Sequence, residues 1–213
     1  RITGHGEIVT LGYQIGDFDL RGQWKQYIGT TDKNYGIATF EAELKRQSAS
    51  WFEEQYYSNH FRWDNDFHAA TYLNFNLRYS YKTYSIGVKQ TTINDLIYFG
   101  TDARPAQYDG MFSIREAYLS FYQKLGRFDL EGFASLQKSS NEEVMHLPLL
   151  MGQLKFGYSQ PVFHKAAILH PCITVCYFTK YYADAYMPVT RTFYLQNEVQ
   201  IGNFPFIDLA VAL

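Results

Sequence analysis

The sequence predicts an all-β protein, an antiparallel up-and-down transmembrane β-barrel of which this chain supplies about 11 to 12 strands. Apolar and polar residues alternate over stretches of about ten residues, which is long for soluble strands, centred near 5–6 residues. Short turns and longer polar connections alternate along much of the chain, as they do in membrane barrels. No apolar run approaches the roughly 18–20 residues of a membrane-spanning helix.

The first expected hairpin surrounds the segment IGDF, residues 15–18. A two-residue Gly-Asp loop of type II′ would pair Ile15 with Phe18, because the twist of that turn matches the twist of its strands. The same pattern returns at 125–128 and 201–204, and residues 81–84 form a corner without glycine. The expected periplasmic turns are therefore at Gly16, Lys82, Gly126 and Gly202.

Further strands are expected at 36–45, 66–81, 150–158 and 167–177, with longer connections at 29–34, 98–111, 138–148 and 179–190. The strands at 36–45 and 66–81 would both run toward the short turns. An antiparallel meander forbids this arrangement, so we expect a missing segment or an irregular strand within 46–62.

Alternation assigns side chains to two opposite faces, because neighbouring residues of a strand point to opposite sides. One face is expected to meet lipid, since the other carries bulky charges of both signs that a water-filled lumen solvates. The residues expected to line the lumen are Arg21, Lys25, Glu41, Glu43, Asn74, Asn76, Arg78, Asp129, Glu131 and Lys155. Those expected to face lipid are Leu20, Trp24, Phe40, Leu73, Phe75, Leu77, Phe128, Leu130, Leu154, Phe156, Ile173 and Val175. A soluble barrel is the alternative that patterning alone leaves open.

The chain is expected to be a single β-barrel domain over residues 1–213, truncated at both ends. It opens without Met or a signal-like segment, and it stops within the apolar alternation LAVAL. The net charge of −2 gives no basic field for a nucleic acid, so no nucleic-acid partner is expected.

No motif for catalysis, metal binding or a cofactor stands out. The six histidines are scattered without metal spacing, and Asp64, Asn65 and Asp66 form an oxygen-rich turn that lacks a full calcium ligand set. Cys172 and Cys176 would lie about 13 Å apart on one strand at ~3.3 Å per residue, too far for a disulfide. We therefore expect no enzyme activity, metal or cofactor.

Four stretches carry a resemblance to a known family: YYSNHFRWDNDF (56–67), DARPAQY (102–108), QKSSNEEVMHLPLL (137–150) and the segment 176–213. They resemble the outer-membrane "putative porin" family of Bacteroidota, and the likeness runs through most of residues 13–213. The resemblance implies a barrel in the bacterial outer membrane, with further strands after residue 213 and a removed signal peptide before residue 1. It brings no catalytic or binding motif.

The expected function is passive diffusion of small hydrophilic solutes through a lumen of mixed charge, in contact with outer-membrane lipid. The alternative is a non-conducting barrel that serves with protein partners as a subunit of a larger outer-membrane assembly.

Overall fold

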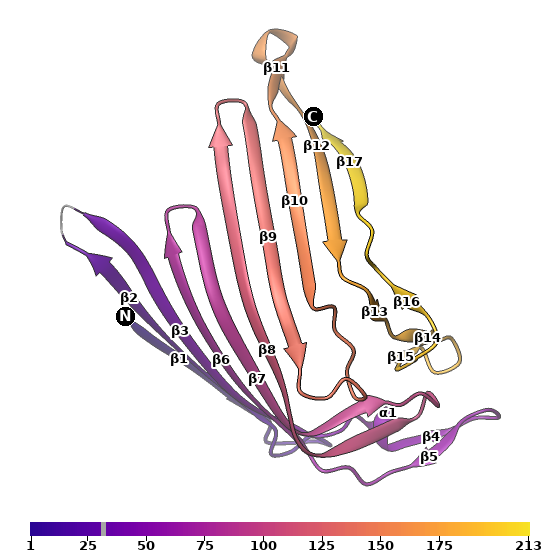
Figure 1. Ribbon diagram of the computed structural model, residues 1–213. Helices are drawn as coiled ribbons and strands as arrows, with labels where there is room; N and C mark the ends of the chain where they lie inside the picture. The colour runs from indigo at the N-terminus through magenta and orange to yellow at the C-terminus, as the bar shows by residue number, and fades with distance from the viewer. Residues whose placement is uncertain (31–32) are drawn as a thin grey trace.

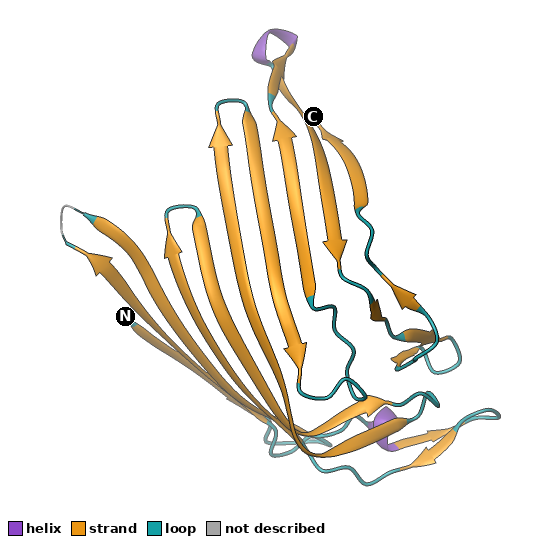
Figure 2. Ribbon diagram, viewed as in Figure 1, coloured by secondary structure: helices purple, strands orange, loops and turns teal. Residues whose placement is uncertain are grey.

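The computed structural model describes residues 1–30 and 33–213; residues 31–32, within the predicted connection 29–34, lie outside the described residues. Eleven strands of the described chain form one antiparallel sheet, which curves and remains open between its two edges (Figure 1). The prediction of an all-β, antiparallel up-and-down architecture is confirmed, and strands make up most of the chain (Figure 2). Among the described residues, no helix has the length and apolar character needed to cross a membrane.

The strands of the main sheet follow the chain order, apart from the small hairpins inserted between them. They are β1 (Ile2–Ile8), β2 (Phe18–Gly29), β3 (Asn34–Gln47), β6 (Ala70–Tyr81), β7 (Tyr84–Phe99), β8 (Pro105–Leu125), β9 (Phe128–Ser139), β10 (Leu150–Tyr158), β11 (Gln160–Val162), β12 (Ala167–Phe178) and β17 (Phe206–Ala212).

Short elements occupy the connections. They are helix α1 (Trp51–Glu54), the pair β4 (Gln55–Tyr57) and β5 (Arg62–Asp64), the 3-10 turn η1 (Phe163–Lys165), β13 (Tyr181–Tyr182), β14 (Ala185–Met187), β15 (Thr192–Tyr194) and β16 (Gln200–Ile201). Helix α1 begins with a capping box, in which Ser50 and Glu53 satisfy each other's backbone N–H groups.

The two ends of the sheet differ. At the short-turn end lie the paired residues Gly29 and Asn34 of β2 and β3, the turns 82–83 and 126–127, and the tip 159–166 with β11 and η1. The long-loop end carries the connections 9–17, 48–69, 100–104, 140–149 and 179–205 (Figure 1). The corners at Lys82 and Gly126 are confirmed as two-residue turns, because Tyr81 pairs with Tyr84 and Leu125 pairs with Phe128. In both turns the first loop residue has a positive φ, at 52° and 64°, as type II′ geometry requires.

The predicted turns at Gly16 and Gly202 are wrong, because both residues lie at the long-loop end. Gly16 donates its N–H to Val9 O at 2.9 Å, so it continues the β1–β2 ladder into the loop 9–17. Gly202 follows β16, which pairs with β13 and not with the next strand, β17. In both places the Gly-polar-Phe pattern is the same as at Gly126, but pairing between more distant residues decides the local structure.

The expected strand within 46–62 is also corrected. β3 pairs directly with β6, and the segment between them forms α1 and the β4–β5 hairpin at the long-loop end. The sequence predicts the same direction for the strands 36–45 and 66–81 because it assigns the connection 29–34 to the long-loop end. In the structure Gly29 pairs with Asn34 at the short-turn end. The meander is therefore consistent without an additional strand between β3 and β6.

The expected loop 98–111 is mostly strand. β7 and β8 continue past the sheet as a long hairpin, and the connection shrinks to 100–104. A β-bulge interrupts this hairpin, where Asp95 (φ 58°) opposes both Asp109 and Gly110. Beyond the bulge, Leu96 joins the small buried core of Ile93, Phe112 and Val144.

Gly87 on β7 allows an aromatic ring to lie against the sheet. A Cβ added there would lie 2.5 Å from Tyr118 Cζ and 2.9 Å from Leu77 O. Tyr118 reaches over the glycine and donates its hydroxyl to Asn76 Oδ1 at 2.9 Å. Because Gly87 has no side chain, it leaves the space that the Tyr118 ring occupies, as in the glycine–aromatic pairs of other sheets.

We expect Gly87→Val to destabilise the fold by about 1–3 kcal/mol, because the new side chain displaces Tyr118 and presses on the β6 backbone. Urea unfolding in detergent micelles measures the effect. Gly22→Val is the matched control, because nothing lies within 4 Å of a Cβ added to that strand glycine. Equal losses in the two variants would contradict the role given to Gly87.

Candidate functional site

The register of the sheet sorts the predicted site residues onto two faces. Cross-strand partners in an antiparallel pair lie on the same face, so the pairing can be followed from strand to strand. One row runs from Arg21 through Glu43 to Asn74, and a second runs from Gln23 through Glu41 to Asn76. All ten residues expected to line a lumen fall on this face, which we call the polar face. They are Arg21, Lys25, Glu41, Glu43, Asn74, Asn76, Arg78, Asp129, Glu131 and Lys155.

The first row of the polar face is an ion-pair network. Arg21 Nη2 lies 2.6 Å from Asp19 Oδ2, and Arg21 Nε lies 3.0 Å from Glu43 Oε1. Asn74 donates to the other oxygen of Glu43 at 2.7 Å. Three strands therefore contribute to one network in which the charges are paired.

The second row centres on Glu41. Its carboxylate accepts hydrogen bonds from Gln23 Nε2 at 2.6 Å and from Asn76 Nδ2 at 2.9 Å. Arg78 Nη2 lies 4.0 Å from the same carboxylate, and Asn76 also accepts from Tyr118. The donors to Glu41 are neutral amides, so its negative charge is solvated by side chains and is only loosely paired.

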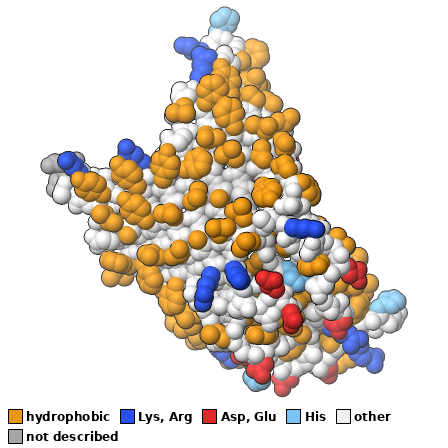
Figure 3. Space-filling model, in the orientation of Figure 1, with side chains coloured by type: hydrophobic (Ala, Val, Ile, Leu, Met, Phe, Trp, Pro, Cys, Tyr) orange, Lys and Arg blue, Asp and Glu red, His pale blue; other side chains and the backbone are white. Residues whose placement is uncertain are grey.

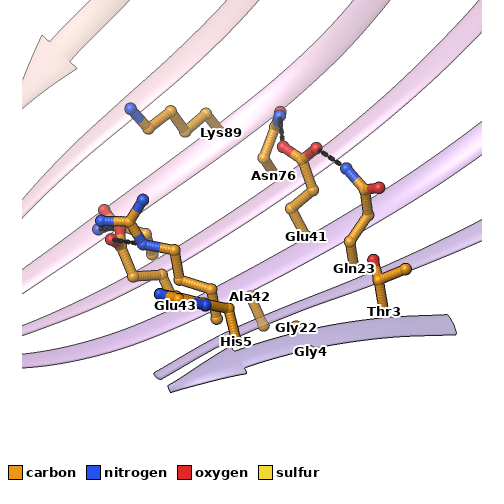
Figure 4. Close-up of a pocket in the computed structure, with 12 residues that line it drawn as sticks. Thr3, Gly4, His5, Gly22, Gln23, Glu41, Ala42, Glu43, Asn76 and Lys89 are labelled. Atoms are coloured by element: carbon orange, nitrogen blue, oxygen red, sulfur yellow. Dashed lines mark hydrogen bonds and ion pairs between the residues drawn. The ribbon is translucent and has the colours of Figure 1, made fainter. Parts of the chain in front are cut away.

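These two rows border a hollow of ≈ 500 Å³ on the polar face (Figure 4). His5 on β1 and Lys89 on β7 lie at its borders, and Gln23 and Asn76 approach Glu41 from opposite sides. Sequence reasoning missed Gln23, His5 and Lys89 as members of this site. The signal that identifies them is the same alternation, which includes Gln23 on β2 and extends to His5 on β1 and Lys89 on β7.

The polar face continues on β9, β10 and β12 with charges of both signs. Glu131 and Lys155 are cross-strand partners, and His170 Nε2 lies 2.9 Å from Asp129 Oδ1. Lys25 lies farther along the face, where the register continues through Thr39 to Arg78. Acids and bases are therefore interspersed along this face, and such an arrangement suits hydrated polar solutes of either sign.

The opposite face is apolar. The register places all twelve residues expected to meet lipid on it: Leu20, Trp24, Phe40, Leu73, Phe75, Leu77, Phe128, Leu130, Leu154, Phe156, Ile173 and Val175. Trp24, Leu77 and Leu154 keep 47%, 51% and 45% of their surface exposed, so they are not packed into a core. Figure 3 shows hydrophobic side chains spread over the strands, with charged side chains gathered mainly near the two ends.

Near the short-turn end the apolar face carries a row of aromatic side chains. Tyr84 lies 6.3 Å from Phe121 between ring centroids, and Phe128 lies 4.9 Å from Tyr158. An aromatic girdle at this level is typical of proteins that meet a membrane–water interface.

The connections at the long-loop end pack together by aromatic contacts. Trp63 on β5 stacks on Tyr56 at 4.8 Å and meets the edge of Phe52 at 5.4 Å. The loop 9–17 joins them through Tyr13, which donates its hydroxyl to Glu54. That hydrogen bond, with smaller contributions from burial and charge, raises the pKa of Tyr13 to about 12.

The sequence candidates for a metal site and for a disulfide can be placed within the described residues. No group of three His, Cys, Asp or Glu side chains within them is arranged to hold a metal ion. Asp64 accepts hydrogen bonds from Gln55 and Tyr57, and Asn65 donates to the backbone of Glu53, so this turn is held by its own contacts. Cys172 and Cys176 are free thiols, as expected.

Asp184, between β13 and β14, gives a test of the long-loop packing. Burial raises the pKa of its carboxyl, and His146 only partly offsets that rise. A raised carboxyl pKa means that the folded loop prefers the protonated acid, so the ionised form at pH 7 weakens the packing.

We therefore expect Asp184→Asn to slow proteolysis of the loop 179–205 at pH 7. The difference from the unchanged protein should fade as the pH falls toward ~4, where the ordinary carboxyl is protonated. Limited proteolysis across this range measures it, with Glu198→Gln on the same connection as the control. A difference independent of pH would contradict the assignment.

Comparison with known proteins identifies the family. The model of a family described as "Putative porin" matches residues 1–212. A search of curated proteins and a search of solved structures each find no match. The family match covers nearly the whole chain, and the all-β sheet with one apolar face agrees with it. The chain therefore belongs to the "Putative porin" family, which implies a place in a bacterial outer membrane.

Proposed function

We propose that the polar face lines a water-filled passage across the outer membrane, through which small hydrophilic solutes diffuse passively. The apolar face then contacts outer-membrane lipid, the short-turn end faces the periplasm and the long-loop end faces outward. The observation that carries this proposal is the complete separation of the ten polar and twelve apolar residues onto opposite faces. The resemblance of four stretches to a family of Bacteroidota further suggests that group as the source.

The charged residues in the strands favour a water-filled passage on energetic grounds. A Lys or Arg that faces lipid at the bilayer midplane costs about 2–4 kcal/mol in a β-barrel. Arg21, Arg78 and Lys155 avoid that cost if their face meets water. The exposed apolar side chains on the other face fit lipid for the converse reason.

The proposed mechanism needs no catalytic group. Paired and interspersed charges, such as Arg21 with Glu43, replace part of the hydration of a passing solute without holding it tightly. We therefore propose a pore with weak ion preference and no enzymatic activity.

A second candidate is a non-conducting subunit of a larger outer-membrane assembly. It is favoured by the packing at the long-loop end, where Val144 of the loop 140–149 is buried against Phe112 and Ile93 on the side of the polar face. If this packing closes the passage to solutes, the function would depend on the long loops, which would form the binding surface for protein partners.

Planar-bilayer recording of the full-length protein separates these two functions. A pore gives stepwise currents that scale with salt concentration. Reproducible insertion without current, together with co-migration with partner proteins on native gels, would support the second function and exclude the first.

Within the pore proposal, we expect Glu43→Gln to shift the reversal potential in a salt gradient toward anion preference. The variant removes one negative charge and leaves Arg21 with fewer partners. Glu142→Gln removes the same charge from the long loop 140–149 and is the control. Equal shifts in the two variants would show that Glu43 does not line the conducting path.

A further inference from the structure

Two basic side chains lie side by side on the apolar face. Arg115 on β8 and Lys138 on β9 are direct cross-strand partners, and Gln90 on β7 is the next residue in the same row. The row shares its face with Phe75, which pairs with Gln90, and with Leu136, two residues from Lys138. Arg115 and Lys138 are both exposed.

Like charges that face each other directly across two strands repel and destabilise the sheet. Among the described residues, no acidic side chain forms an ion pair with Arg115 or Lys138. This differs from the polar face, where Arg21 has two carboxylates within 3.0 Å. The pair therefore concentrates positive charge where a negative ligand from outside the chain would stabilise it.

The position of the pair is specific. In the described strands of the main sheet, outside the β7–β8 extension that begins at the bulge, the apolar face carries three charged side chains, and all are basic: Arg46, Arg115 and Lys138. Arg46 is already engaged, since its Nη1 donates to Gly16 O at 3.2 Å and lies 3.8 Å from Asp17. Arg46 and Lys138 lie one residue from the long-loop ends of β3 and β9, and Arg115 faces Lys138 from β8.

An apolar hollow of ≈ 470 Å³ adjoins the pair. Phe40, Phe75, Leu77, Val88 and Leu136 line it, and Arg115, Lys138 and Leu149 also border it. A hydrocarbon chain fits the apolar lining, and a phosphate group fits the basic pair, because Arg can bind phosphate by two parallel hydrogen bonds while Lys contributes a point charge.

We propose that Arg115 and Lys138 bind the phosphate of a phosphate-bearing lipid in the leaflet at the long-loop end, with one acyl chain of that lipid in the adjoining hollow. This inference rests on the proposed contact of the apolar face with lipid, but it does not depend on whether the polar face conducts. The lipid phosphate relieves the repulsion between the two side chains, and the site would anchor the barrel at a defined depth.

Native mass spectrometry of the full-length protein in detergent tests the site, with phosphatidic acid as the probe. Phosphatidylcholine of the same acyl chains tests whether an exposed phosphate is needed, and inorganic phosphate tests whether the lipid chain is needed. We expect phosphatidic acid to bind preferentially, and the double variant Arg115→Gln, Lys138→Gln to bind it at least about tenfold more weakly, a loss of ~1.4 kcal/mol.

The matched control is Lys82→Gln with Arg127→Gln, which removes two positive charges from exposed positions at the short-turn end. Binding by the Arg115 and Lys138 variant at the level of this control would overturn the proposal, as would equal binding of phosphatidylcholine or tight binding of inorganic phosphate alone. If the double variant does not fold, Arg115→Gln and Lys138→Gln are measured singly, and each is expected to weaken binding.

Bilayer recording keeps the two proposals apart. The double variant is expected to conduct like the unchanged protein, because its substitutions lie on the apolar face. Lipid binding without current would contradict the proposed pore and support the lipid site. Current without selective lipid binding would contradict only the lipid site.

Discussion

Hydrogen bonding between neighbouring backbones is the constraint on which the rest of this structure depends. In a bilayer, each unpaired backbone polar group costs several kcal/mol, so membrane strands must be fully paired. Pairing also fixes the register, and a slip of one residue would turn every side chain of a strand to the other side. A slip of β3 against β6 would place Glu41 among Phe75 and Leu77 and would break its bonds to Gln23 and Asn76.

The two faces therefore stabilise the register in different ways. The polar face does so by specific contacts that link several strands, such as Arg21 with Glu43 and Glu41 with Asn76. Under the proposed function, the apolar face would do so by contact with hydrocarbon, which needs only a continuous apolar surface. Stacked pairs such as Phe40 with Phe75, whose ring centroids lie 6.1 Å apart, add smaller contributions.

Much of this arrangement could be predicted from the sequence, because strand alternation is a local property. It assigned Leu73 and Phe75 to one face and Asn74 and Asn76 to the other, and it identified the turns at Lys82 and Gly126. Alternation could not assign Gly16 and Gly202, because their neighbouring residues follow the same pattern as those of Gly126. The pairing of Val9 with Gly16 and of β13 with β16 decides their structure. The networks around Glu41 and Glu43 were equally out of reach, since alternation gives the face of a residue and not its partners.

The β-bulge opposite Asp95 limits how this hairpin can vary among related sequences. Leu96 reaches the same buried core as Ile93 only because β8 offers two residues, Asp109 and Gly110, at that level. Deleting either residue would restore strict alternation in β7. Leu96 would then point away from the core, and Asp95 would point toward it. Insertions at the tip of the hairpin, 100–104, do not change which residues of β7 face the core. Evolution can lengthen or trim the hairpin at its tip, whereas the residue count at the bulge is fixed.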